Sequence, residues 1–353
     1  MDPLVRILSL PILSLSLLCL WPAATAATQD ARSLVRTFLH DKMGFSQSDI
    51  EAVDAGRAVA KQMHTRDAVD VNIFGAVRIA APAEAFIRQV RAIDVYERKL
   101  GVLQVGKFQQ VPQLADLSAL SLDRADLSDL ASCRKGDCDI QLSAAAIEMF
   151  RTKVNWRAAD SRPTANRLFQ QMMFEWLETY RAGGKAALPA YEDQEKPISV
   201  AAEFKLLPSP GDMPTPLQEL TRYVTDFPAA TLADAEDFYY WNKGEFGMKS
   251  TIRLNHVTIY QVPHPPAPEP MRYIVATTQI YSDHYFSATL ELRTVVNDAA
   301  RPGQGFYLFY TTKSRVTGLT GFIGTLIRPL VRSRARSGME NYLNVTKKSV
   351  EGR

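Results

Sequence analysis

Cysteine and histidine are scarce in this chain, and several common catalytic motifs are missing. Only three cysteines and five histidines occur among 353 residues. The histidines show no short spacing such as H-x-x-x-H, and there is no G-x-S-x-G elbow, H-E-x-x-H helix or phosphate-binding P-loop. The sequence therefore predicts no metal centre and no cofactor. The net charge of +3 gives no overall basis for binding nucleic acid.

Long hydrophobic runs are also scarce, apart from one near the N-terminus. Residues 7–20 are almost entirely apolar, Arg6 precedes them, and Ala24 and Ala26 form an A-x-A cleavage site. The run is shorter than the about 20 residues that span a bilayer, which favours a cleaved signal peptide at 1–26 over a membrane anchor. We therefore expect a periplasmic or secreted protein.

Removal of such a signal peptide would leave two cysteines, Cys133 and Cys138, on either side of a turn around Gly136. In an oxidising compartment a nearby pair of this kind predicts a disulfide. Free thiols and redox catalysis are the alternatives, although redox catalysis usually uses a CxxC spacing. So short a ring contributes about 2 kcal/mol at best, which would fix one turn rather than hold the fold.

The first two thirds of the chain alternate between helical and strand patterns. Apolar residues at helical spacing, period-two alternation and a proline at a first helical turn indicate the elements. The expected order is a helix at 31–43, two strands within 58–80 joined near 65–67, a helix at 81–93, short strands and turns at 102–130, and a mainly helical segment at 143–228.

The last third is rich in strands and ends in a long helix. Strands are expected at 238–241, 251–262, 271–281, 284–296 and 306–314. Their short, turn-like connections predict an antiparallel meander. A helix at 318–350 closes the chain, and apolar residues from Leu319 to Leu343 recur at i, i+3, i+4 and i+7, which predicts one face packed on the sheet.

Three segments, 69–79, 81–93 and 238–350, together resemble the START-like, helix-grip superfamily, which includes lipid-transfer domains, polyketide cyclases and the birch pollen allergen group. They cover about half of the mature chain. The resemblance implies an α+β fold in which a curved antiparallel sheet grips the last helix, with a hydrophobic ligand between them. The segment 143–228 departs from this pattern and would be a helical insertion into a single elaborated domain.

One face of the meander combines apolar and polar residues as a binding pocket would. A two-residue turn at Ser282 and Asp283 would fix the hairpin register by pairing Tyr281 with His284 and Thr277 with Ala288. The alternative is a sheet margin whose tyrosines and histidines have their polar ends in water. The ligand-binding candidates on this face and its neighbouring strands are His256, Tyr273, Gln279, Tyr281, His284 and Tyr310.

The last helix is the most unusual feature of the charge distribution. It carries Arg328, Arg332 and Arg336 at intervals of one helical turn, before its first acidic residue, Glu340. A basic helix with an apolar face can touch anionic lipid headgroups. The alternative is an ordinary solvated helix face.

These features predict an exported, non-catalytic protein that binds or carries a hydrophobic small molecule or lipid. A second hypothesis is a cyclase- or hydrolase-type enzyme that uses His284 or His256, with Tyr281, as acid and base groups. A third is an envelope protein that binds other proteins and holds no ligand.

Overall fold

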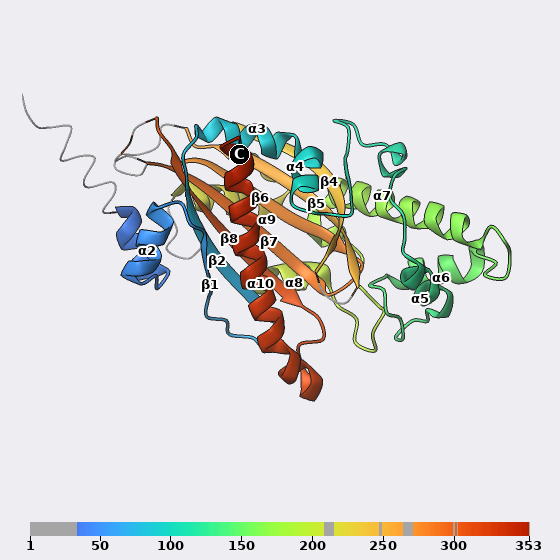
Figure 1. The fold of residues 1–353 in the computed structure, drawn as a ribbon. Coiled ribbons are helices and arrows are strands. Elements are labelled where there is room, and N and C mark those ends of the chain that lie inside the picture. The colour runs from blue at the N-terminus through green and yellow to red at the C-terminus, as the bar shows by residue number, and fades with distance from the viewer. Residues whose placement is uncertain are drawn as a thin grey trace, which may run out of the picture.

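The computed structural model describes residues 34–207, 215–246, 249–263, 271–298, 301 and 303–352 (Figure 1). The predicted signal peptide lies outside these residues. The chain is an α+β protein built on a curved, open, eight-stranded sheet in the order β1-β2-β8-β7-β6-β5-β4-β3. Every neighbouring pair of these strands is antiparallel.

The strands confirm the predicted meander and the predicted pair near the N-terminus. They are β1 Val59–Gln62, β2 Asp70–Ile79, β3 Gln104–Lys107, β4 Ala235–Glu245, β5 Ser250–Gln261, β6 Met271–Ser282, β7 Phe286–Asn297 and β8 Phe306–Val316. Strands β4 to β8 are consecutive neighbours, because short connections favour pairing of successive strands. The early strand β2 pairs with the last strand, β8, and so joins the two ends of the chain.

The helices are π-helix η1 Phe38–Lys42, α2 Gln47–Asp54, α3 Ala83–Arg91, α4 Ile93–Lys99, 3-10 helix η2 Leu114–Leu117, α5 Arg124–Ser132, α6 Ala144–Lys153, α7 Ser161–Ala187, α8 Val200–Leu206, α9 Thr215–Asp226 and α10 Gly321–Val350. The prediction of only strands and turns at 102–130 is wrong, because η2 and α5 lie there. At the start of α5 the Asp126 carboxylate accepts the backbone N–H of Asp123, an N-terminal capping contact that the acidic, leucine-rich pattern conceals.

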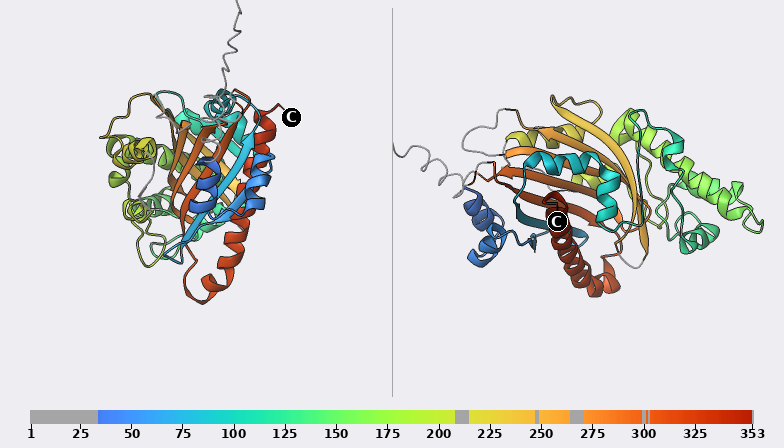
Figure 2. Two further views of the ribbon diagram at one scale, coloured as in Figure 1. Left: turned by 90° about the vertical axis from the view of Figure 1, so that its left-hand side faces the viewer. Right: turned by 45° about the horizontal axis from the view of Figure 1, so that its top comes forward.

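Helices cover both faces of the sheet, so the molecule has three layers (Figure 2). On one face α10 packs with α3, α4 and the strands β1 and β2. A Cβ on Gly75 of β2 would lie 2.7 Å from Leu343 Cδ1, which shows how closely α10 approaches the sheet. On the other face α7, α8 and α9 contact β6 and β7.

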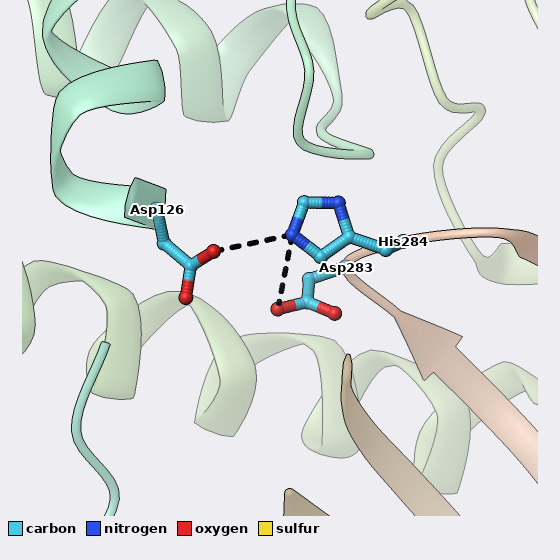
Figure 3. Close-up of side chains that lie close together, drawn as sticks. All are labelled: Asp126, Asp283 and His284. Carbon is cyan, nitrogen blue, oxygen red and sulfur yellow. Dashed lines mark hydrogen bonds and ion pairs between the residues drawn. The ribbon is translucent and has the colours of Figure 1, made fainter. Parts of the chain in front are cut away.

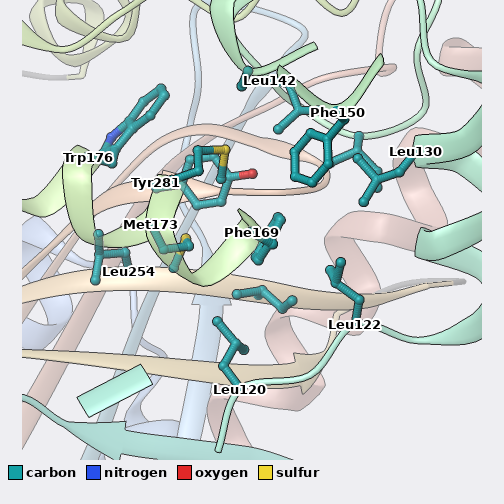
Figure 4. Close-up of a cluster of buried hydrophobic side chains, with 14 of the residues drawn as sticks. Leu120, Leu122, Leu130, Leu142, Phe150, Phe169, Met173, Trp176, Leu254 and Tyr281 are labelled. Carbon is teal, nitrogen blue, oxygen red and sulfur yellow. The ribbon is translucent and has the colours of Figure 1, made fainter. Parts of the chain in front are cut away.

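The helical segment and the sheet share one apolar core (Figure 4). Trp176 of α7 is part of this core; its indole N–H donates to the Ile280 carbonyl at 2.8 Å and its ring stacks on Tyr191. Cys133 and Cys138 form the predicted disulfide and are buried within this core. The ring holds the C-terminal end of α5 against the turn that follows it.

Helix α10 has two halves in different surroundings. Met339 and Leu343, in its second half, are buried against the sheet. The first half extends past the end of the sheet (Figures 1 and 2), where Phe322 is 82% exposed and Leu326 is 66% exposed. The prediction of one continuous apolar stripe on the sheet is therefore wrong for this half. In the part of the chain described, no helix is both long and apolar enough to cross a membrane.

Candidate functional site

The hairpin between β6 and β7 differs from the sequence prediction. Residues 283–285 form a three-residue connection in which Tyr285 has a φ of 63°, in place of the expected two-residue turn. Thr277 consequently pairs with Glu291 rather than with Ala288. This shift of an odd number of residues places the side chains of β7 on the opposite faces from those predicted. The predicted register is wrong.

The structure divides the six predicted ligand-binding residues among four environments. Tyr273 and Tyr310 lie on the face covered by α10, His256 and Tyr281 lie on the face covered by α7, Gln279 is buried within β6, and His284 lies beside α5. A β-bulge between Leu254 and Asn255 interrupts the pairing of β5 with β6 and helps turn Tyr281 toward Trp176. The six residues therefore do not meet in one cavity.

Two surface cavities lie elsewhere. One of about 240 Å³ is bordered by α3, α4 and the end of α10, with Tyr96 and Val350 in its wall. The other, of about 590 Å³, lies beside the end of α7 and is lined in part by Lys185 and Phe227. Burial lowers the pKa of Lys185 to about 8. None of the six predicted residues lines either cavity, so their role in binding a ligand stays a prediction.

His284 belongs to a buried cluster with two carboxylates, Asp126 from α5 and Asp283 from the hairpin turn (Figure 3). Its Nε2 lies 3.2 Å from Asp126 Oδ1 and 4.0 Å from Asp283 Oδ2. At most 4% of any of the three residues is exposed. Burial of two carboxylates costs free energy unless positive charge or hydrogen-bond donors offset their loss of hydration.

Burial and the neighbouring charges act against each other on the pKa values of Asp283 and His284. Burial raises the pKa of Asp283 to about 7. Burial alone would lower the pKa of His284, but the hydrogen bond to Asp126 and the charge of Asp283 raise it above its ordinary value. The two carboxylates thus stabilise the charged form of the His284 imidazole.

His256 belongs to a separate group of hydrogen-bonded side chains on the face covered by α7. Its Nε2 donates to Asp237 Oδ1 at 2.8 Å, and its Nδ1 accepts from the Tyr180 hydroxyl at 2.9 Å. Asp237 also accepts from Thr258 at 2.6 Å and from Tyr223 at 2.5 Å. Burial would raise the pKa of Asp237, but these hydrogen bonds, led by that from His256, lower it below its ordinary value.

Replacement of Asp237 by Asn tests how much these hydrogen bonds stabilise the fold. We expect Asp237→Asn to lower the free energy of unfolding at pH 7 by about 1–3 kcal/mol, because it weakens hydrogen bonds to a charged acceptor. Since the folded-state pKa is depressed, the contribution of Asp237 is present above the unfolded value of 3.8 and is lost as the pH falls through the folded value. Urea denaturation at pH 7 and pH 3 should therefore show a smaller difference between the two proteins at pH 3.

The control for this measurement is Glu148→Gln, in an exposed ion pair with Arg151. It should leave the stability unchanged at both pH values. An Asp237→Asn difference that is equal at pH 7 and pH 3 would contradict the assignment of the ionised carboxylate as the acceptor.

Between the sheet and α10 lies a buried network of polar side chains. Arg293 donates to Glu291 Oε2 at 2.6 Å and to Thr277 Oγ1 at 2.9 Å. Its guanidinium group also lies over the rings of Tyr310 and Tyr342, at 4.6 and 5.2 Å from their centroids. Tyr310 donates to Glu291 at 2.8 Å. Strand and helix side chains therefore contact each other directly where the resemblance implied a ligand.

The predicted basic face of α10 is only partly free. Arg328 donates to the Leu319 carbonyl, and Arg332 donates to Thr65 Oγ1 and the Asp70 carbonyl. These acceptors are neutral, so the bonds hold the two guanidinium groups in place without cancelling their charge. Arg336 is exposed, as is Arg334.

Sequence reasoning missed Asp126, Asp237 and Asp283. Asp126 stands in an acidic, leucine-rich stretch that was predicted to form short strands and turns, and Asp283 was expected only as a turn residue. Asp237 begins the strand-rich region without any motif around it. Asp126 meets His284 through tertiary packing across 158 residues, and Asp237 meets His256 through the pairing of β4 with β5. Capping chemistry at Asp123 is the one local pattern that could have located α5 and Asp126.

No protein-family model matches this chain, and no match was found among curated proteins or solved structures.

Proposed function

We propose that this protein binds the surface of anionic lipid membranes through the first half of α10. The observation that carries the proposal is the exposed apolar face of that half, which we call the α10 apolar face. It consists of Phe322, Ile323, Leu326, Ile327 and Leu330, between 39% and 82% exposed. Contiguous exposed apolar surface of this kind usually marks an interaction site.

The α10 apolar face points away from the rest of the molecule. Successive helical residues are about 100° apart, which places Ile323 and Leu330 on nearly the opposite side of α10 from the buried Met339 and Leu343. Phe322 and Leu326 lie about 100° around the helix from that buried pair. Because this half also extends past the sheet, it can lie against a flat surface without hindrance from the strands (Figure 1). An interfacial helix needs that arrangement to bury its apolar side chains at the headgroup boundary.

The charge of the same half favours an anionic lipid surface over a neutral one. Residues 321–339 contain four arginines and no acidic residue. Arg334 and Arg336 are exposed beside the α10 apolar face, and the hydrogen bonds of Arg328 and Arg332 go to neutral oxygens. Basic residues near an anionic membrane contribute about 1 kcal/mol each to binding.

We also propose that the sheet and α10 form a helix-grip arrangement, supported by the curved antiparallel sheet and the long final helix on one of its faces. A hydrophobic cargo between them is a less favoured function, because the Arg293 and Glu291 network occupies part of that interface. A periplasmic or secreted location, supported by the disulfide between Cys133 and Cys138, would expose the protein to membrane surfaces.

Vesicle co-sedimentation tests the proposed function. We expect the full chain to bind vesicles of phosphatidylglycerol and phosphatidylcholine more strongly than vesicles of phosphatidylcholine alone, and less strongly as salt rises. The double substitution Phe322→Glu and Leu326→Glu should weaken binding by about tenfold or more, because two large apolar side chains no longer enter the interface.

The matched control is Leu103→Glu with Val111→Glu, which changes two exposed apolar residues next to β3, at the opposite edge of the sheet from β1 and β2. Its vesicle binding should equal that of the wild type. The proposal is wrong if the wild type binds neither kind of vesicle. It is also wrong if light scattering shows a dimer that the Phe322 and Leu326 substitutions disrupt and the control substitutions do not. The second result would assign the α10 apolar face to a second copy of the chain.

A further inference from the structure

We infer that Asp126, Asp283 and His284 form a binding site for one divalent transition-metal ion, with zinc as the probe of choice. The three potential ligand atoms, one from each residue, lie within 4.8 Å of one another. They come from α5 and from the β6–β7 connection, which are far apart in sequence (Figure 3). The site is independent of the proposed membrane surface on α10.

An unsatisfied buried oxygen points to a ligand at this position. Asp283 is fully buried, and its Oδ2 has no hydrogen-bond partner among the residues described. This oxygen lies 4.0 Å from His284 Nε2, too far for a hydrogen bond. A buried carboxylate oxygen without a partner is costly, and a coordinated cation would remove that cost.

Each carboxylate is already oriented by a backbone contact. Asp283 Oδ1 accepts the N–H of Ile252 at 2.8 Å, and Asp126 Oδ2 accepts the N–H of Asp123 at 3.1 Å. These bonds leave the second oxygen of each carboxylate for the centre of the cluster. Metal sites use the same division of labour, in which outer contacts fix the orientation of the ligands.

The spacing and the charge both suit a small divalent ion. Ligand atoms about 2.1 Å from a tetrahedral zinc ion are about 3.4 Å from each other. The separations of 3.2 and 4.0 Å from His284 Nε2 lie on either side of that value. Two ionised carboxylates and a neutral imidazole balance a charge of +2. Imidazole among the ligands favours zinc or a similar transition ion over magnesium or calcium.

A bound ion would tie the first turn of α5 to the end of the sheet. Cys133, at the other end of α5, is fixed by its disulfide to Cys138. Three protein ligands would leave a coordination position for water. We therefore infer a site that holds the helical segment on the sheet.

Zinc titration of the full, disulfide-intact chain, stripped of metals by chelation and dialysis, tests the site. Isothermal titration calorimetry should show one zinc ion per chain. Zinc at 100 times its dissociation constant should raise the thermal midpoint by a few degrees. Magnesium at the same concentration should have no such effect.

Asp283→Asn is the decisive variant. It should weaken zinc binding by about tenfold or more, while the metal-free variant is at least as stable as the metal-free wild type, because the amide removes a buried unpaired oxygen charge. Asp237→Asn, which alters the other buried histidine–aspartate pair, is the matched control and should keep wild-type zinc affinity.

Two results would overturn the site: no stoichiometric zinc binding below a dissociation constant of about 1 mM, or equal zinc affinity of Asp283→Asn and the wild type. If Asp283→Asn does not fold, His284→Gln serves in its place. The cobalt-loaded wild type gives a readout without any substitution. Its visible spectrum should show a four- or five-coordinate ion, and the spectrum of hydrated cobalt would contradict the inference.

Discussion

Arg293→Met should lower the free energy of unfolding by about 3–5 kcal/mol. Arg293 is 5% exposed, and its loss would leave the carboxylate of Glu291 buried with Tyr310 as a close donor and Arg253 at 3.5 Å. The stacking of the guanidinium group over Tyr310 and Tyr342 would be lost as well. Urea denaturation at pH 7 measures the change.

A double variant separates two contributions to the loss of stability: the unpaired charge of Glu291 and the lost packing of the Arg293 side chain. Arg293→Met combined with Glu291→Gln removes both charges and should recover more than half of the lost stability. Arg151→Met, in an exposed ion pair, is the control and should change little. If Arg293→Met costs less than about 1 kcal/mol, water must reach the network, as it would in a ligand cavity beneath α10.

Gly184→Ala should cost about 3 kcal/mol or more, and Gly338→Ala should instead stabilise the protein. Gly184 has φ 63° and ψ −159°, a conformation that residues with a Cβ rarely adopt. An alanine Cβ there would lie 2.0 Å from the carbonyl oxygen of Phe227, and this backbone atom cannot rotate away. The chain must shift at the end of α7 to accommodate the methyl group.

Gly338 provides the matched control for the same chemical change. It is an exposed residue inside α10, and an added Cβ would meet nothing within 4 Å. Alanine should add about 0.5–1 kcal/mol because it restricts the unfolded chain and favours the helix. Thermal and urea denaturation of both variants should give opposite signs, and a stabilising Gly184→Ala would contradict the observed backbone at the end of α7.

The strands were predictable from sequence, whereas their register was not. Alternating β-branched and aromatic residues located β4 to β8, because successive side chains of a strand point to opposite faces of the sheet. The pairing of Thr277 with Glu291 depends on a positive φ at Tyr285, a residue type that rarely adopts one. Local sequence gave no indication of it.

The environment of α10 was also beyond the sequence pattern. Apolar residues at helical spacing predict a buried face only as far as a partner surface extends. Leu343 meets the sheet, whereas Phe322 lies past its end. The cluster of Asp126 and His284 shows the same limit, since these residues meet only through the packing of segments 158 residues apart.

The connection between β3 and β4 has a consequence for how the fold could vary. The chain leaves the sheet after Lys107, whose partner in β4 is Tyr240, so the helices from η2 to α9 lie in the connection between two adjacent antiparallel strands. Strands β3 and β4 are therefore paired like the two strands of a β-hairpin, and the helices between them form the layer that covers one face of the sheet. A shorter or longer segment could replace these helices without any change in the order of the strands. The helices on one face of the sheet would then differ, while α10 would keep its position on the other face.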